Sequence, residues 1–377
     1  MRTTPTLPMS PIFLTISTST DMSMFNHMQA RLVECTHGAA ILTPWSVATS
    51  LRRELGEAEA EAGMAAARLR ALDGAELLVA EVSDADAGVG AEVMYALHNV
   101  RIPVLCVHRK GTSCAMLSGI SHPLLTTGEY ADEAELDALL DEFATPPEQP
   151  GRIFVVEGGD GAGKQTQSAM LRERLRSEGY PVSTLDYPHD AALHGKLIRT
   201  LLSGAKGDIK ALNPLLFASL YAVNRADTAP LLNAWLKKGH NVILDRYVEA
   251  NFGHQASKLP KEERPGLIKQ LAAFEHDWLD LPRAHRVVYL DLPPQEAAKA
   301  MAADGSRASL DIHETAGGDY KAAVRETFLW CAEEHSHWVR VACVDDAGGR
   351  YSKQELSDVL YARLAGEFVN QKKTTPK

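Results

Sequence analysis

Short apolar runs alternate with longer stretches of helical periodicity along this chain. In its first part, the apolar runs lie at residues 12–16, 39–42, 77–82 and 104–107. A run of four to six apolar residues suits a strand that is buried on both faces of a sheet. The stretches between them, such as 46–72 and 91–99, have the apolar spacing of amphipathic helices. This alternation predicts a parallel sheet with helices on both faces.

The second part of the chain shows the same alternation without a recognisable repeat of the sequence. Its apolar runs lie at residues 153–157, 182–187, 241–245 and 286–291. A proline-rich stretch follows a helical pattern at 132–143 and has the composition of a linker. The predicted fold is therefore α/β, with two doubly wound parallel-sheet domains. The predicted boundaries are a disordered N-terminus at 1–10, a first domain at 11–144, a linker at 145–151 and a second domain at 152–370.

The composition of the 377 residues, with 45% hydrophobic and 23% charged, is that of a globular protein. The formal net charge of −10 argues against a nucleic-acid partner, although N–H groups and arginine can still hold a small phosphorylated substrate locally. Five scattered cysteines without metal-ligand spacing favour free thiols in a reducing compartment. The N-terminus lacks the long apolar core of a membrane span or secretory signal. We expect no membrane partner and a cytoplasmic location, with an organellar address left open.

The strongest chemical signal is the glycine-rich segment GGDGAGKQT at 158–166, which lies between the apolar run 153–156 and a helical pattern at 167–176. Its glycines allow a turn tight enough to point several backbone N–H groups at a polyphosphate, and the helix N-terminus adds a favourable dipole. Lys164 supplies a mobile positive charge. The strand before and the helix after predict a phosphate-binding loop for a nucleotide rather than an ordinary glycine turn.

Two further segments carry candidate chemistry. The predicted strand 241–245 ends in Asp245, as the metal-organising acid of a P-loop enzyme does, and Arg246 follows at once. An ordinary ion pair at the strand end is the less favoured alternative. Tyr221 and Arg225 lie four residues apart on one helix face, where a ring can stack on a base and a guanidinium can bond its exocyclic oxygen. Core packing beside a surface charge would give the same pattern.

Taken together, these segments resemble the thymidylate kinases, which transfer a phosphoryl group from ATP to dTMP. The resemblance covers about residues 152–370 and implies a P-loop nucleotide kinase fold. The matching positions follow the family's order: the loop DGAGKQTQ at 160–167, the pair Asn224 and Arg225 that ends an L-L-F helix, the D-R-Y segment at 245–247, then Asn251 and Gln255. Segments 254–258 and 311–314 are similar to one branch of the family.

The resemblance implies ATP and Mg²⁺ as cofactors and roles for individual residues. The ATP phosphates would be bound by Gly158, Gly161, Ala162, Gly163, Lys164, Gln165 and Thr166. The residues that would bind dTMP are Asp160, Tyr221, Arg225, Arg246, Asn251 and Gln255. Of these, Arg246 would hold the acceptor phosphate and Asp160 would face the sugar hydroxyl and help to order Mg²⁺. Tyr221 would stack on thymine, and Arg225 with Asn251 would read its polar edge.

Catalysis in this family depends on charge stabilisation, for which the resemblance implies Lys164, Asp160, Arg246 and a lid arginine, Arg307. Position 161, where some members have an arginine inside the loop, is glycine here. The implied metal ligands are Thr166 and Asp245. Gln165 stands where a hydroxyl ligand of Mg²⁺ usually follows the lysine, so Thr166 or water is expected to replace it.

The acceptor side departs from the family's pattern at His189 and Asp190, where many members offer an arginine to the acceptor phosphate. Lys196 and Arg199 are the candidates to compensate.

Other assignments share part of this pattern. A kinase for another monophosphate, or a related deoxynucleoside kinase, would use the same loop. The combination of Tyr221, Arg225 and Asn251 favours a pyrimidine with an oxygen at its 4-position, so dUMP is the expected second substrate, whereas a cytosine edge presents the opposite donor pattern. A non-catalytic sensor would bind ATP without transferring its phosphate. The resemblance also implies a homodimer.

The first domain resembles the nucleoside 2-deoxyribosyltransferases, in particular the 2′-deoxynucleoside 5′-monophosphate N-glycosidases. The similarity lies in LLVAEVSDADAGVGAE at 77–92, with weaker support from RIPVL at 101–105, and implies Glu92 as a nucleophile on the anomeric carbon. Arg68 stands near the expected second acid, and Asp86 replaces an expected phosphate-binding serine. Two interpretations follow: a bifunctional protein with an active glycosidase, or a degenerate domain kept for assembly, stability or regulation, which these differences favour.

Overall fold

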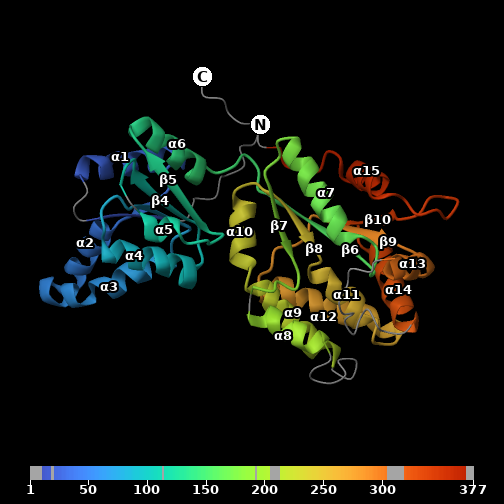
Figure 1. Ribbon diagram of the computed structural model, residues 1–377. Coiled ribbons are helices and arrows are strands. Elements are labelled where there is room, and N and C mark those ends of the chain that lie inside the picture. Colours follow the sequence, from blue (N-terminus) through green and yellow to red (C-terminus); the bar gives the residue numbers. More distant parts are fainter. Residues whose placement is uncertain are drawn as a thin grey trace, which may run out of the picture. The chain divides into compact units, whose positions relative to one another are not determined.

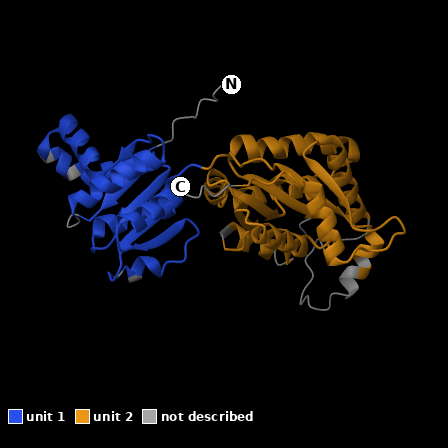
Figure 2. Cartoon of the chain, turned by 90° about the horizontal axis from the view of Figure 1, so that it is seen from above, with its two compact units in different colours: residues 1–146 blue, residues 147–377 orange. Residues whose placement is uncertain are grey.

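The computed structural model describes residues 11–17, 21–112, 114–191, 193–203, 213–303 and 318–370. The chain forms two compact units, an N-terminal unit of residues 1–146 and a C-terminal unit of residues 147–377, which are coloured separately in Figure 2. The boundary between them falls inside the proline-rich segment 145–151. Each unit has its own parallel sheet and its own buried core. The predicted disordered N-terminus, 1–10, lies outside the described residues.

The N-terminal unit is built around a parallel sheet with the strand order β2-β1-β3-β4-β5. The strands are β1 (Ile12–Ile16), β2 (Ile41–Leu42), β3 (Leu77–Glu81), β4 (Val104–Arg109) and β5 (Leu125–Tyr130). The helices are α1 (Met22–Cys35), α2 (Pro44–Leu55), α3 (Glu57–Asp73), α4 (Ala87–Tyr95), a π-helix at Ala96–Val100, α5 (Ala115–Ser118) and α6 (Glu133–Ala144). Helices α1 and α6 pack side by side, and their apolar faces share one buried cluster with β1 and β4.

The C-terminal unit has a second parallel sheet, with the strand order β10-β9-β6-β8-β7. Its strands are β6 (Arg152–Gly158), β7 (Val182–Asp186), β8 (Asn241–Asp245), β9 (Arg286–Asp291) and β10 (Trp338–Ala342). Its longer helices are α7 (Lys164–Ser177), α8 (Leu193–Leu202), α9 (Pro214–Ala226), α10 (Ala229–Lys237), α11 (Val248–Ala256), α12 (Arg264–Ala272), α13 (Pro294–Ala303), α14 (Gly318–Glu334) and α15 (Lys353–Leu364). A 3₁₀ turn at Lys261–Glu263 precedes α12, and a π-helix at Ala273–Trp278 follows it.

Successive side chains of β6 point to opposite faces of the sheet, and both faces are covered, which explains why the strand is apolar from Ile153 to Val156. Ile153 and Val155 point into a cluster formed with α9 to α12 and α14, whereas Phe154 and Val156 point into a second cluster formed with α7 and α15. Figure 1 shows these two groups of helices on opposite sides of the sheet. Strand β6 lies at its centre, between β9 and β8, where the strand order reverses. In open α/β sheets, ligands bind at the carboxyl end of such a position.

The predicted α/β class with parallel sheets is confirmed, and the differences lie in single elements. The expected helical stretch 46–72 is two helices, because Gly56 adopts φ 83° and ends α2. Strands β5 and β10 were not predicted. Both are edge strands with exposed positions, so neither has the continuous apolar run of a central strand. Among the described residues, no helix has the length and apolar character needed to span a membrane.

Candidate active site

The glycine-rich segment forms a loop between β6 and α7. Helix α7 begins at Lys164, with Gly163 as its N-cap at φ 90°, a conformation that glycine adopts without strain. Gly158 is needed for a different reason, because a Cβ at this position would lie 2.9 Å from the carbonyl oxygen of Leu290. The first N–H groups of a helix have no acceptor within it, so the start of α7 offers donors to an anion.

Lys164 folds back over this loop. Its Nζ donates to the carbonyl oxygens of Gly158 and Gly159, both at 3.0 Å. Burial, followed by the neighbouring charge of Arg246, lowers the pKa of Lys164 from 10.5 to about 8, while Asp160 opposes the shift. Phosphate oxygens are stronger partners for an ammonium group than neutral carbonyls are. A polyphosphate can therefore draw Lys164 away from the loop.

Carboxylates lie beside the loop because parallel strands end at the same edge of the sheet. Asp245 ends β8, where it is the register partner of Val156 on β6. Asp186 ends β7 and is the register partner of Asp245. Burial raises the pKa of Asp245, and the charge of Lys164 opposes this effect. Adjacent carboxylates next to a phosphate loop suit a nucleotide that carries a divalent cation.

Arg246 connects this strand end to the loop and to α11. Its φ of 64° is in the left-handed region, which costs a non-glycine residue about 1–2 kcal/mol. Its Nη2 lies 3.5 Å from Oδ1 of Asp160, and its Nη1 lies 3.8 Å from Oε2 of Glu157 and 3.0 Å from Nε2 of His254. Burial raises the pKa of Glu157, which Arg246 opposes. Backbone strain of this kind is typical of functional sites.

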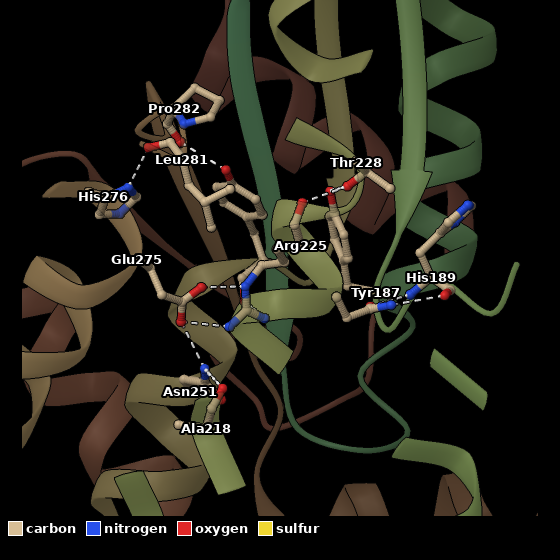
Figure 3. Close-up of polar contacts among 12 residues, drawn as sticks. Tyr187, His189, Ala218, Arg225, Thr228, Asn251, Glu275, His276, Leu281 and Pro282 are labelled. Atoms are coloured by element: carbon tan, nitrogen blue, oxygen red, sulfur yellow. Dashed lines mark hydrogen bonds and ion pairs between the residues drawn. The ribbon is translucent and has the colours of Figure 1, made fainter. Parts of the chain in front are cut away.

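Arg225 and Asn251 belong to a buried network centred on Glu275 (Figure 3). Nε and Nη2 of Arg225 donate to the two carboxylate oxygens of Glu275 at 2.5 and 2.6 Å, and Nη1 donates to the carbonyl oxygen of Tyr247 at 3.1 Å. Nδ2 of Asn251 donates to Oε1 of Glu275 at 2.8 Å and to the carbonyl oxygen of Ala218 at 3.3 Å. Both expected base readers thus have partners inside the protein. The sequence carried no signal for Glu275.

The other expected substrate residues have different surroundings. Tyr221 is half-buried, with its ring edge-on to Phe217 at 5.4 Å. Gln255 is 1% exposed, and its Oε1 has no hydrogen-bond partner within the described ranges. Arg307, the expected lid arginine, lies outside the described residues, as does the segment 311–314.

The side chain of Asn224 fixes the backbone at His189, a contact that the sequence did not indicate. Its Oδ1 accepts the backbone N–H of His189 at 2.7 Å, and its Nδ2 donates to the carbonyl oxygen of His189 at 3.0 Å. This pair of bonds holds the chain just after the cis peptide bond between Tyr187 and Pro188. Arg199, a candidate to compensate on the acceptor side, pairs with Asp190 at 2.8 Å.

A phosphate loop at the end of the central strand, an acid at the end of the next strand and an arginine facing the loop define a P-loop phosphotransferase. The family model for thymidylate kinase matches residues 156–344, which lie in the C-terminal unit. The chain belongs to the thymidylate kinase family, and its C-terminal unit is a nucleoside monophosphate kinase that phosphorylates dTMP. The sequence-based expectation of this activity is confirmed.

Two relatives illustrate the extent of the similarity. A thymidylate kinase of Cutibacterium acnes is 31% identical over 217 residues, which cover 57% of this chain and 98% of that protein. One of Bifidobacterium longum is 34% identical over 193 residues, 51% of this chain and 88% of that protein. A solved thymidylate kinase structure from Candida albicans aligns with 58% of this chain and 92% of its own, at 19% identity and a TM-score of 0.47. A large part of this chain lies outside the alignments with the two bacterial enzymes.

In the N-terminal unit, Arg68, which departs from the glycosidase pattern, pairs with the candidate nucleophile. Glu92 on α4 is 3% exposed, and its Oε1 accepts from Nε of Arg68 at 2.6 Å. Its Oε2 has no hydrogen-bond partner among the residues that the structure describes. Oδ1 of Asp86 accepts the N–H groups of Gly88 and Val89 at 2.7 and 3.0 Å, so a carboxylate occupies the N-terminus of α4. The comparisons lend no support to the glycosidase or sensor alternatives, and the glycosidase resemblance stays a prediction.

We expect the Arg68→Met variant to destabilise the N-terminal unit by about 3 kcal/mol. The substitution removes the partner of a buried carboxylate and leaves Glu92 uncompensated. Hydrogen exchange of peptides from α3 and α4 in increasing urea would measure the unfolding free energy of this unit separately from that of the C-terminal unit. Arg70→Met, at an exposed position of the same helix, should change the unfolding free energy by less than about 0.5 kcal/mol. Equal exchange in both variants would show that the ion pair contributes nothing.

Proposed function

We propose that the C-terminal unit transfers the γ-phosphoryl group of ATP to the phosphate of dTMP, at the carboxyl ends of β6 and β8. The observation that carries the proposal is the convergence of a mobile lysine, two acids and an arginine at this edge: Lys164, Asp160, Asp245 and Arg246. Phosphoryl transfer needs alignment and charge neutralisation more than covalent help from the protein. The ATP phosphates would be bound by backbone N–H groups of Gly158, Gly161, Ala162, Gly163, Lys164, Gln165 and Thr166.

The acidic residues fit a magnesium ion that is shared with the nucleotide. Within the described residues, no three His, Cys, Asp or Glu side chains form a ready-made metal site. Mg²⁺ usually keeps several waters and binds one or two carboxylates together with substrate phosphates. Asp245 and the hydroxyl of Thr166 supply such a partial set, and Thr166 is half-buried whereas Gln165 is exposed. When bound, the ion would offset the charge that develops between the β- and γ-phosphates.

The acceptor would bind between the loop, α9 and α11. Arg246 would hold the phosphate of dTMP, Asp160 would accept from the sugar hydroxyl and Tyr221 would stack on the base. The contact of Arg246 with Asp160 supports this arrangement. Arg307 is the proposed lid cation. Gln255 completes the proposed set, since its buried Oε1 remains available as an acceptor within the described residues.

The hydrogen bonds of Asn251 suggest how the base would be recognised. Its two acceptors, Glu275 and the carbonyl group of Ala218, use both protons of Nδ2 and set the orientation of the amide. Asn251 would therefore meet a base through Oδ1, an acceptor that matches N3–H of thymine or uracil but not N3 of cytosine. Three of the five N–H groups of Arg225 have partners among the described residues, so two would remain for the 4-oxygen. We infer that dUMP is a second substrate and that dCMP is excluded.

The Arg246→Ala variant tests the acceptor site. We expect kcat/KM for dTMP to fall about 10²- to 10³-fold, because one positioned cation at a developing charge is lost, with little change in the KM for ATP. ADP release by the full chain would be measured with dTMP, dUMP, dCMP and dGMP. Arg283→Ala is the matched control, since Arg283 is exposed and pairs with the nearby Asp277 in the same unit. Full activity of Arg246→Ala, or turnover of dCMP as fast as dTMP, would contradict the proposed acceptor site.

We further propose that the protein is a homodimer in the cytoplasm. Leu197 on α8 and Leu215 and Leu216 on α9 are exposed by 43%, 41% and 64%, and apolar side chains on neighbouring helices suit a subunit contact. The five cysteines are free, which suits a reducing compartment. Analytical ultracentrifugation of the full chain tests the first proposal, and a monomer at micromolar concentration would contradict it. Fractionation of the source cells tests the second.

A further inference from the structure

His254 contacts Arg246, the arginine that would bind the acceptor phosphate. It lies on α11, and its Nε2 is 3.0 Å from Nη1 of Arg246. Guanidinium nitrogens donate hydrogen bonds and cannot accept them, so Nε2 must be the acceptor. The imidazole proton then lies on the other ring nitrogen, Nδ1.

Tyr320 on α14 supports this assignment from the opposite side of the ring. Nδ1 of His254 is 3.2 Å from the hydroxyl oxygen of Tyr320, and that hydroxyl group donates to the carbonyl oxygen of His254 at 3.2 Å. With its own proton given to the carbonyl, the hydroxyl oxygen is left as the acceptor for Nδ1–H. The contacts on both sides of the ring thus agree with a proton on Nδ1 and an acceptor at Nε2.

The ring of His254 is also fixed by packing. Its plane lies edge-on to Phe328 of α14, with the ring centroids 6.1 Å apart. A Cβ at Gly253 would lie 2.2 Å from Cζ of Phe328, so α11 approaches α14 too closely for any side chain at position 253. The imidazole therefore packs beside Phe328 while its Nε2 faces Arg246.

The contact of the Arg246 guanidinium with His254 is shorter than its contacts with two neighbouring carboxylates. Asp160 and Glu157 lie farther away, at 3.5 and 3.8 Å. A third carboxylate in place of the imidazole would add negative charge where a phosphate must bind, whereas a neutral acceptor fixes one N–H without opposing the phosphate. We propose that His254 is a positioning residue, which orients Arg246 so that its remaining N–H groups face the acceptor phosphate of dTMP. The inference rests on the proposed role of Arg246.

Binding of dTMP and of thymidine, measured by calorimetry, separates this role from a structural one. We expect His254→Phe, which keeps a ring against Phe328 but has no acceptor, to weaken dTMP binding about tenfold. Binding of thymidine should change less than about twofold, because thymidine has no phosphate for Arg246 to hold. The KM for dTMP should rise and the KM for ATP should not. His254→Gln, whose side-chain oxygen can accept from Arg246, should restore most of the affinity.

A double-mutant cycle with Arg246→Ala completes the test. If His254 acts through Arg246, His254→Phe should have no further effect on dTMP binding once Arg246 is alanine. Normal dTMP binding by Arg246→Ala would overturn the proposed acceptor site itself. Weak binding by Arg246→Ala together with normal binding by His254→Phe would overturn only the positioning role. Equal losses for dTMP and thymidine would also overturn it, in favour of a structural role.

A second variant keeps the proposal testable if His254→Phe does not fold, which circular dichroism would show. Tyr320→Phe removes the hydroxyl oxygen that accepts from Nδ1–H, so the tautomer is no longer imposed from that side. We expect dTMP binding about threefold weaker, again with thymidine binding unchanged. Unaltered dTMP binding by Tyr320→Phe, together with the same binding by any folded aromatic replacement of His254, would refute the proposal.

Discussion

Lys164→Met should lower kcat/KM for dTMP phosphorylation by about 10³-fold. Methionine keeps an unbranched side chain of similar length, but the ammonium that can move from the carbonyl oxygens of Gly158 and Gly159 to the nucleotide is lost. ADP release by the full chain, with dTMP as acceptor, measures the effect. Lys269→Met, at an exposed position on α12, is the matched control and should retain full activity. Activity of Lys164→Met within tenfold of the parent chain would contradict the assignment of the loop.

The pH dependence of ATP binding gives a second measurement on the same residue. The lowered pKa of Lys164, about 8, means that the nucleotide-free protein loses this positive charge as the pH rises through 8. ATP binds the charged form, so ATP affinity should fall above pH 8, and bound ATP should raise the pKa again. Lys164→Arg carries a charge throughout this range, so its weaker binding of ATP should be independent of pH. A flat profile in the parent chain would show that Lys164 stays charged.

Glu275→Leu should destabilise the C-terminal unit by about 3–5 kcal/mol. The substitution leaves the guanidinium of Arg225, which is 1% exposed, without its counter-ion and removes an acceptor from Asn251. Urea unfolding followed by tryptophan fluorescence measures the change, because four of the five tryptophans lie in this unit: Trp235, Trp278, Trp330 and Trp338. Glu262→Leu, an exposed control in the same unit, should shift the unfolding free energy by less than about 0.5 kcal/mol.

Replacing both partners separates the structural role of Arg225 from base recognition. The double variant Arg225→Met with Glu275→Leu should recover most of the lost stability, since two apolar side chains leave no buried charge. A stable double variant that phosphorylates dTMP with an unchanged KM would make Arg225 purely structural. A stable double variant with a raised KM for dTMP and an unchanged KM for ATP would assign it to the base. A double variant no more stable than Glu275→Leu would contradict the expected gain.

The phosphate loop could be predicted because all of its determinants are contiguous. A buried strand, glycines at fixed positions and a helix start occur within about twenty-five residues, and each is a local property of the chain. Asp245 could be placed beside the loop for a related reason, since it ends a strand of the same parallel sheet. The break between α2 and α3 depends on the backbone of one residue, Gly56, and β5 is an edge strand. Such features produce a weaker hydrophobic pattern in the sequence.

The contacts around Arg225 and Arg246 could not be predicted, because their partners are distant in sequence or ordinary in type. Glu275 lies 50 residues after Arg225 and looks like any acidic residue near the end of a helical pattern. His254 is eight residues from Arg246, but the segment that carries it indicated only a branch of the family. Whether such a side chain faces solvent or the core depends on how the whole unit packs.

The two ends of strand β6 connect to different parts of the chain. Its amino end, Arg152, follows the linker directly, and its carboxyl end, Gly158, begins the nucleotide loop, so about 20 Å of extended backbone separates the two. A segment joined before β6 therefore connects at the end of the strand opposite to the glycine-rich loop. A chain attached at this end interrupts neither the strand nor the loop, so the kinase unit can carry an N-terminal extension without a change to either.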